Sequence, residues 1–252
     1  MTDRSELLAA FDTLLQPERF RDYGPNGLQV EGCARVSKVV SGVTASRALI
    51  EAAIDAGADA IFVHHGLFWR GQDGRVTGWM KQRLRLLLAH DINLFAYHLP
   101  LDAHPEFGNN AQLGLKLGLQ TQSHFGEQDL GCLGERVDGL VFASGQVLSD
   151  HLSQVLNRSV ALIEPSNIAI KKIAWCTGGA QSYFEAAIAA GADAFITGEM
   201  SEPQAHIARE SGVLYLACGH HASERYGASA AAAHVATQLG LAHEFIDIDN
   251  PA

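Results

Sequence analysis

Two pairs of side chains that bind metal ions well lie at the same spacing in the two halves of the chain. His98 and Asp102 follow an apolar run at 93–97, and His220 and Glu224 follow a similar run before Gly219. A histidine and a carboxylate four residues apart share one face of a helical turn, so each pair can reach a common ion. The sequence therefore predicts metal ligands in both halves.

A histidine doublet lies upstream of the first pair. His64 and His65 end the apolar run 60–63 and precede Gly66. Neighbouring residues on a strand point to opposite faces, but a turn at Gly66 can direct both imidazoles into one cavity. A lone histidine at a strand end is usually only hydrogen-bonded. A doublet beside two repeated histidine and carboxylate pairs instead favours a metal site, and the number of ligands favours a dinuclear one.

The repetition extends well beyond these ligands. Residues 38–65 align without gaps on residues 172–199, an offset of 172 − 38 = 134, and EAAIDAGADA in the first copy meets EAAIAAGADA in the second. The alignment resumes at His98 and His220 with an offset of 220 − 98 = 122. The first copy therefore has 134 − 122 = 12 extra residues between 66 and 92. One duplicated unit of this size indicates two related domains and not a solenoid.

Short apolar runs alternate with helical patterns in both copies, which is typical of an α/β fold built from β-α-β units. Strands are expected at 39–43, 60–65, 173–176, 194–197 and 213–216, with helices at 46–56 and 183–190. Gly57 and Gly191 occupy the positions where left-handed residues end helices. We expect a first repeat domain at 1–125, and at 126–252 an intervening strand and helix segment followed by the second repeat domain.

The remaining segments also have regular patterns. An amphipathic helix is expected over 1–16 and an alanine-rich helix over 225–239. The stretch between the copies predicts strands at 139–143 and 160–163 on either side of a helix at 150–157, and 245–248 predicts a closing edge strand. In open α/β sheets, ligands bind beyond the carboxyl ends of the strands, where all the histidines named above lie.

Glu199 is a further candidate because it occupies the position in the second copy that His65 has in the first. Its carboxylate could enter the same cavity as a general acid or base. Two glycine-containing strand ends, 42–44 and 177–179, could donate backbone N–H groups to a phosphate, or could simply form tight turns. His221 is expected to face away from the cavity or to support His220. The other histidines are interpreted as surface or hydrogen-bonded residues.

Composition limits the class of protein. The chain has 252 residues, of which 47% are hydrophobic and 18% charged, and no apolar run approaches the roughly 20 residues of a membrane span. The first residues lack the pattern of a signal peptide. The four cysteines have no Cys-x-x-Cys spacing, which argues against a thiolate zinc site and against a disulfide framework. These features predict a cytoplasmic protein with reduced thiols and no membrane partner.

A formal net charge of −10 disfavours nucleic acid as a partner, because such binding depends on cationic contacts with phosphate. One basic cluster runs against this average and overlaps the extra residues of the first copy. It contains Arg70, Arg75, Lys81, Arg83 and Arg85. The cluster is either a solvated helix face or a patch that steers phosphate groups toward the site.

Four motifs carry a resemblance that spans essentially the whole chain. They are DYGPNGLQV at 22–30, VHHG at 63–66, HLPLD at 98–102 and GHHASE at 219–224. The chain resembles the GTP cyclohydrolase 1 type 2 homologue family, also called the Nif-three-like family, and is most similar to its short bacterial members. The resemblance implies two similar intertwined α/β repeats with the metal site between them, and a toroidal homohexamer.

The resemblance also implies a set of ligands. His64 and Asp102 would bind one metal, His65 and His220 the other, and Glu224 would bridge the two. His98 is not a ligand in this family, so here it is a candidate for orienting a ligand or for proton transfer. Mixed histidine and carboxylate ligation suits iron, zinc or manganese without selecting one of them.

Two divalent ions in such a site would activate water, so the expected activity is metal-dependent hydrolysis of a small nucleotide-like or phosphoester substrate. The alternative is a metal-binding protein without catalysis, such as a metallochaperone or a regulatory protein. A catalytic site keeps an open coordination position, whereas a structural site is closed by protein ligands. A family name alone is weak evidence about substrate.

Overall fold

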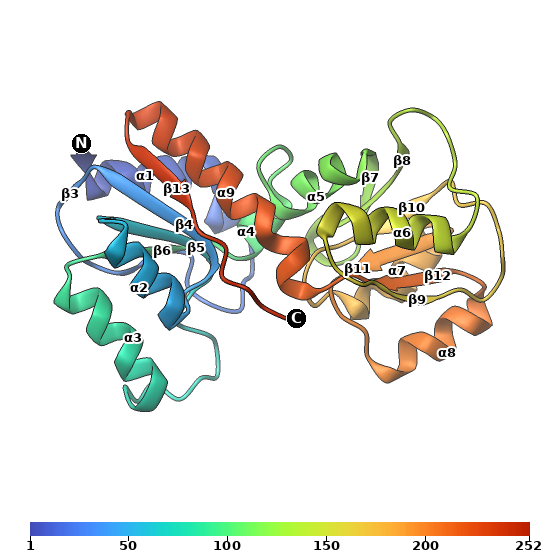
Figure 1. The fold of residues 1–252 in the computed structure, drawn as a ribbon, viewed down its shortest axis with the longest axis horizontal. Helices are drawn as coiled ribbons and strands as arrows, with labels where there is room; N and C mark the ends of the chain where they lie inside the picture. Colours follow the sequence, from blue (N-terminus) through green and yellow to red (C-terminus); the bar gives the residue numbers. More distant parts are fainter. The chain divides into compact units, whose positions relative to one another are not determined.

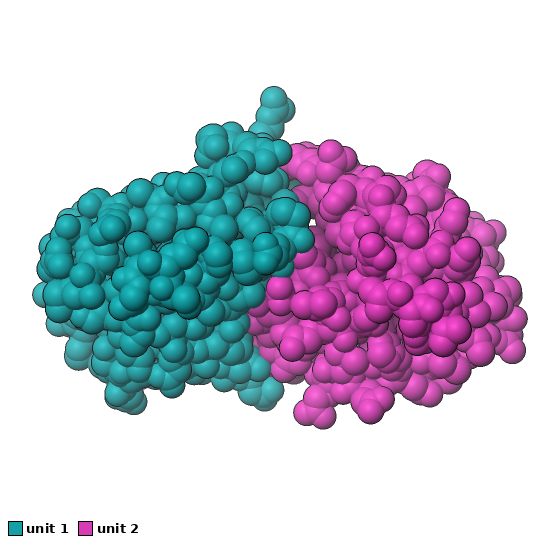
Figure 2. Space-filling model, turned by 90° about the horizontal axis from the view of Figure 1, so that it is seen from above, with its two compact units in different colours: residues 1–108, 227–249 teal, residues 109–226, 250–252 magenta.

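The computed structural model describes residues 1–252, and contacts within the chain group it into two compact units. Unit 1 contains residues 1–108 and 227–249, and unit 2 contains residues 109–226 and 250–252 (Figure 1). Figure 2 distinguishes the two units by colour. Each unit combines helices with one main sheet, which confirms the predicted α/β class.

The units differ in extent from the expected division into 1–125 and 126–252. Residues 109–125 belong to unit 2, and residues 227–249 return to unit 1. The physical reason is the long C-terminal helix α9 (His220–Leu239), whose later residues pack into the core of unit 1 and carry the chain back to its sheet. The two α/β units are thus intertwined along the sequence.

Unit 1 is built on a five-stranded sheet in the order β13-β4-β5-β6-β2. Its parallel strands are β4 (Lys38–Thr44), β5 (Ala60–His65), β6 (Asn93–Ala96) and β13 (Ala242–Phe245), and β2 (Gly27–Val30) is antiparallel at one edge. A small second sheet pairs β1 (Thr2–Asp3) with β3 (Arg35–Val36). The one-turn helix η1 (Pro17–Arg19) and the short helix α4 (Leu99–Ala103) complete the connections.

Helices lie on both faces of this sheet (Figure 1). The alternation of side chains along the strands explains how each face is covered. Phe62 belongs to the apolar core shared with α1 (Arg4–Leu15) and α9, whereas its neighbours on β5 belong to the core shared with α2 (Arg47–Asp55) and α3 (Gly78–Ala89). Residues two apart on a strand share a face, so a strand that is apolar throughout contributes side chains to the apolar cores on both faces of the sheet. The helix predicted over 1–16 is confirmed, with Leu7, Phe11 and Leu15 buried.

Unit 2 has a six-stranded sheet in the order β7-β8-β10-β11-β12-β9. Its strands are β7 (Leu119–Phe125), β8 (Gly131–Arg136), β9 (Ala161–Ile163), β10 (Ile173–Trp175), β11 (Ala194–Thr197) and β12 (Leu214–Ala217). Its helices are α5 (Asn109–Leu117), α6 (Gly145–Leu156), α7 (Phe184–Ala189) and α8 (Glu202–Ser211), with one-turn helices at Glu127–Asp129 and Gln181–Tyr183. Strands β10, β11 and β12 are parallel and repeat the arrangement of β4, β5 and β6.

Several predicted elements need correction. The expected strand at 139–143 does not form, and only Phe142 makes an isolated bridge, to Ile170. Helices α6 and α9 begin earlier than predicted, at Gly145 and His220, and the closing edge strand lies at 242–245 and not at 245–248. Gly57 and Gly191 have φ values of 69° and 81°, as expected of left-handed residues after a helix.

Two further sequence predictions can be compared with the structure. All four cysteines are free thiols, and burial raises the pKa of Cys132 to about 11 and that of Cys218 to about 12, so both remain protonated. No helix combines the length and the apolar character needed to cross a lipid bilayer.

Candidate metal centre

The histidine doublet ends β5 in unit 1. His64 is fully buried, and its Nδ1 lies 3.1 Å from the carbonyl oxygen of Tyr97. A carbonyl only accepts hydrogen bonds, so Nδ1 of His64 carries a proton, and Nε2 is the ring nitrogen that a neutral imidazole would offer to an ion. His65 is opposite Thr44 in the β4–β5 pairing, and its Nδ1 lies 3.2 Å from the Thr44 hydroxyl. The two imidazole centroids are 4.4 Å apart, so the doublet places both rings together.

His98 and Asp102 lie on the turn after β6, beside the doublet. His98 precedes the first residue of α4, and Asp102 is buried within that helix. Ring nitrogens of His64, His65 and His98 all come within 4.8 Å of one another. The Asp102 carboxylate lies 3.5 Å from Nε2 of His64. Unit 1 by itself thus assembles three imidazoles and one carboxylate at the carboxyl ends of two neighbouring parallel strands.

Asp22 organises this group, although the sequence did not identify it as a functional residue. Its carboxylate lies 2.7 Å from Nδ1 of His98 and accepts hydrogen bonds from the backbone N–H groups of Tyr23 and Leu99 and from the Asn26 amide. Burial raises the pKa of Asp22, but the hydrogen bond and charge of His98, with the other donors, lower it overall. The only signal was that Asp22 begins the motif at 22–30.

Unit 2 presents the second histidine and carboxylate pair. His220 is the first residue of α9, and its Nε2 lies 3.2 Å from a carboxylate oxygen of Glu224. Nδ1 of His220 lies 2.6 Å from the Glu199 carboxylate. Burial lowers the pKa of His220, but the hydrogen bonds and charges of Glu224 and Glu199 outweigh it and raise the pKa to about 9. The i, i+4 spacing thus brings both side chains of this pair to one point, as predicted.

Glu199 contacts His220 on the Nδ1 side of its ring, opposite the nitrogen that approaches Glu224. Besides this contact, its carboxylate accepts a hydrogen bond from the Gln181 amide at 3.2 Å, and its backbone carbonyl accepts one from the Tyr215 hydroxyl at 2.6 Å. A carboxylate on the Nδ1 side of an imidazole fixes the ring orientation and makes Nε2 a better ligand. The arrangement therefore suits an orienting role for Glu199, and its role as a general acid or base stays a prediction.

The glycine-containing segment after β10 packs against the same pair. Gly178 has a φ of +69°, and a side chain there would collide with the Glu224 carboxylate. Its N–H donates to the Ser223 hydroxyl, and the N–H of Thr177 donates to the Asn110 side chain. Because protein acceptors already use these N–H groups, the structure supports the tight turn and not the phosphate cradle for this segment.

The other histidines have ordinary surroundings. His151, His206 and His243 contact the Leu117 carbonyl, Glu202 and the Ser41 hydroxyl. His104 accepts from two backbone N–H groups, His234 stacks on Phe107, and His221 is buried near the start of α9. His124 lies near Cys132, and His90 is exposed at the end of α3.

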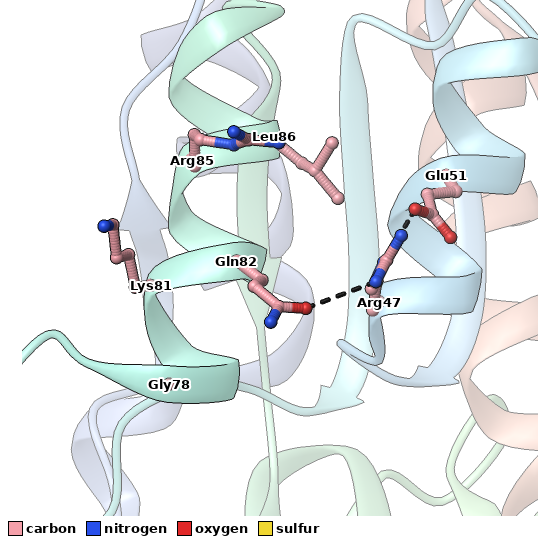
Figure 3. A pocket seen from close by; sticks show the side chains of 7 residues that line it. All are labelled: Arg47, Glu51, Gly78, Lys81, Gln82, Arg85 and Leu86. Atoms are coloured by element: carbon pink, nitrogen blue, oxygen red, sulfur yellow. Dashed lines mark hydrogen bonds and ion pairs between the residues drawn. The ribbon is translucent and has the colours of Figure 1, made fainter.

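The residues of the basic cluster have different partners, and the Arg83 guanidinium lies over the Trp79 ring. Arg70 bonds the Asp22 carbonyl, and Arg75 pairs with Asp73. Lys81 and Arg85 line a shallow pocket between α2 and α3, where Gln82 bonds Arg47 and Arg47 pairs with Glu51 (Figure 3). In Figure 3 the Lys81 side chain points away from Arg47. This dispersion favours the solvated helix face over a phosphate-steering patch.

Comparisons with known proteins agree with the motifs. The model of the family Duf34/NIF3 (NGG1p interacting factor 3) matches residues 2–251. A protein of Neisseria meningitidis serogroup A named GTP cyclohydrolase 1 type 2 homolog is 46% identical over 252 residues, covering 100% of both chains. One of the same name in Escherichia coli is 45% identical over 249 residues, covering 98% of this chain and 99% of its own.

Solved structures give the same result. The structure titled protein ybgI, unknown function, superposes with a TM-score of 0.95 at 44% identity, covering 100% of both chains. A protein from Thermus thermophilus superposes with a TM-score of 0.87 at 32% identity, again over 100% of both chains. With a family match over nearly its full length and close relatives that it covers end to end, the chain belongs to the Duf34/NIF3 family.

Proposed function

We propose that this protein binds two divalent metal ions per chain and uses them to hydrolyse a small nucleotide-like substrate. In this proposal His64 and Asp102 bind one ion, His65 and His220 bind the other, and Glu224 bridges them. His64, His65 and Asp102 belong to unit 1, and His220 and Glu224 belong to unit 2.

One observation supports this proposal more than any other. Each of the three proposed histidine ligands has a partner at its Nδ1 atom: a carbonyl for His64, a hydroxyl for His65 and a carboxylate for His220. Metal-binding histidines commonly use one ring nitrogen in this way while the other binds the ion. The same pattern at all three positions therefore supports metal binding.

The donor set also fits the proposed ions. Imidazole nitrogens and carboxylate oxygens together suit iron, zinc and manganese, and none of the four cysteines belongs to the group. When bound, a pair of such ions supplies Lewis acidity and activates water for hydrolysis. Glu199 and Asp22 would hold the rings of His220 and His98 in place, and His98 would orient a ligand or move a proton. The relatives' name makes GTP the first substrate to test.

The proposed function extends to the oligomeric state and the cellular location of the protein. We propose a toroidal homohexamer in the cytoplasm, with a small molecule and not nucleic acid as its partner. The resemblance to the family supports the ring, and the net charge of −10 weighs against nucleic acid. Sedimentation of the purified protein tests the assembly, because a hexamer of this 27.0 kDa chain has six times that mass.

The experiment that tests the site measures metal content and turnover on the same samples. Protein purified without chelator is expected to contain two ions per chain and to release product from GTP or another nucleotide in proportion to its metal. Glu224→Ala should lose most of the metal while its unfolding transition remains cooperative. Glu185→Ala, an exposed glutamate on α7, is the matched control and should keep both ions.

Each result has a clear meaning. Two ions per chain in the Glu224→Ala variant would refute the bridging assignment. Two ions in the unaltered protein without turnover of any nucleotide, after loading with iron, zinc and manganese in turn, would favour the alternative of a metallochaperone or a regulatory protein.

A further inference from the structure

We propose that Tyr23 and Trp69 form a stacking platform for a heteroaromatic ring of the substrate, next to His98. The inference rests on the proposed function, because it assigns the substrate class of that same site. It concerns residues of unit 1 alone, and neither aromatic residue belongs to the metal ligands.

The first aromatic residue lies on a loop that is tied to the histidine group. Asp22 contacts His98 and also accepts the N–H of Tyr23, the residue that follows it. Asn26, three residues further on, accepts the N–H of His98 at 2.7 Å. The backbone on both sides of Tyr23 is therefore fixed relative to His98.

The second aromatic residue lies on the loop between β5 and α3. This loop spans residues 66–77, whereas the equivalent connection in unit 2 spans only 198–201. Most of the extra residues of the first copy are therefore in the loop that carries Trp69. Unit 1 therefore has a long loop after β5 that has no equivalent of the same length in unit 2.

The two loops are joined to each other. The backbone N–H of Arg70 donates to the Tyr23 carbonyl at 2.6 Å, and the Arg70 guanidinium donates to the Asp22 carbonyl at 2.6 Å. Gly24 has no room for a side chain, because a Cβ there would collide with the Phe68 carbonyl oxygen. The chain thus places Tyr23 and Trp69 by backbone contacts, without using their rings to pack a core.

Both rings approach His98 edge-on. The Tyr23 centroid is 6.0 Å from that of His98 with an interplanar angle of 66°, and the Trp69 centroid is 5.1 Å away at 90°. Trp69 is also 6.0 Å from the ring of His65. Tyr23 is nevertheless 58% exposed. An exposed aromatic ring on a hydrogen-bonded loop beside His98 contributes little to folding and is available for binding.

The chemistry of the two residues selects the ligand class. Tyrosine and tryptophan present flat π surfaces that stack on nucleobases of any identity, and such stacking tolerates different bases because every base has a π face. A sugar phosphate without a base has no flat aromatic surface that could stack on these two rings. We therefore assign the substrate class as small molecules that carry a heteroaromatic ring, such as purine nucleotides.

Tryptophan fluorescence can report binding directly. The chain has three tryptophans, and Trp79→Phe removes the exposed one on α3 while Trp175 is fully buried. In this parent variant, loaded with metal, GTP, ATP and guanosine should quench the emission of Trp69. Ribose 5-phosphate and inorganic tripolyphosphate, which lack a base, should leave it unchanged.

Substitutions then test the platform. Tyr23→Ala should weaken GTP binding by roughly 5- to 150-fold, the range that corresponds to one stacked base. Tyr23→Phe should bind within about twofold of the parent, because the ring alone is needed. Trp69→Ala, followed by calorimetry, should weaken binding similarly, and Trp79→Ala is its matched control, which should not.

Three results would overturn the proposal: no binding of any of the three base-containing probes, equal affinity for GTP and tripolyphosphate, or unchanged affinity in both alanine variants. A change in sedimentation of Tyr23→Ala with unchanged affinity would assign the residue to a subunit contact instead. Metal content is measured on every sample. Absence of metal from the unaltered protein contradicts the proposed function, whereas full metal content with unchanged nucleotide affinity contradicts only the platform.

Discussion

The Glu199 carboxylate lies 2.6 Å from Nδ1 of His220, and the other ring nitrogen of His220 lies 3.2 Å from Glu224. Asp22 has the same relationship to His98 in unit 1, at 2.7 Å. The two carboxylates come from unrelated positions in the repeat, since Glu199 follows β11 and Asp22 precedes β2. Each half of the molecule thus provides an orienting carboxylate by a different route.

Removing the Glu199 carboxylate should weaken metal binding without removing a ligand. Glu199→Gln is expected to lower metal affinity about 10- to 100-fold, because an orienting carboxylate fixes the ring and increases the basicity of its ligand nitrogen. Competition with a coloured chelator measures the change. Glu202→Gln, an exposed glutamate on α8 that pairs with His206, is the control and should bind metal like the unaltered protein. Equal affinities in both variants would show that Glu199 does not orient His220.

Asp22 should matter for stability as well as for the site. Asp22→Ala leaves the N–H groups of Tyr23 and Leu99 and one nitrogen of His98 without their acceptor. A fully buried unsatisfied group costs about 1 to 3 kcal/mol. Only the Leu99 contact is fully buried, and the other two groups can partly bond water, so we expect the free energy of unfolding to fall by about 2 to 4 kcal/mol in urea titrations. Asp73→Ala, which removes an exposed pair with Arg75, should leave the urea midpoint unchanged. A similar midpoint for both variants would contradict this assignment.

Gly178 should resist substitution for two separable reasons. Gly178→Ala combines a side chain at φ +69° with a collision against Glu224, whereas Gly212→Ala places a side chain at φ +78° in open space. Both variants should lose roughly 1 kcal/mol of stability to backbone strain. Only Gly178→Ala should lose further stability and also bound metal. Thermal unfolding and metal analysis measure both effects, and equal behaviour of the two variants would exclude the collision.

His243 should make stability depend on pH. Burial lowers its pKa, although the charge of Glu244 opposes this, and its Nε2 lies 2.8 Å from the Ser41 hydroxyl. The unfolded chain therefore binds a proton below about pH 6.5 before the folded protein does, so this contribution to stability is lost as the pH falls. His243→Gln should reduce the decrease in unfolding free energy between pH 7 and pH 5.

The exposed His206 provides the control for this measurement. It pairs with Glu202 at the surface, so His206→Gln should keep the pH dependence of the unaltered protein. An unaltered slope in the His243→Gln variant would show that this histidine titrates alike in the folded and unfolded chains.

The sequence was most informative where structure depends on neighbours in the chain. The strands around Val39 and Ala60, the helix between them and the left-handed glycines follow local periodicity and were predicted correctly. Strands β7 and β8 were missed, because 119–125 contains several polar residues and β8 pairs it across a turn. The apolar run at 139–143 looked like a strand but found no partner beyond one bridge.

The sequence by itself determined the family, the α/β class and the local groups His64 with His65 and His220 with Glu224, because doublets and i, i+4 pairs are set by short-range geometry. Only the tertiary structure revealed Asp22 behind His98, Glu199 behind His220, and the contact of Tyr23 and Trp69 with His98. Asp22 and His98 are 76 residues apart, and Glu199 and His220 are 21 apart. Such contacts depend on how strands and loops pack. The number of residues between two positions in the sequence does not determine whether their side chains meet in the folded protein.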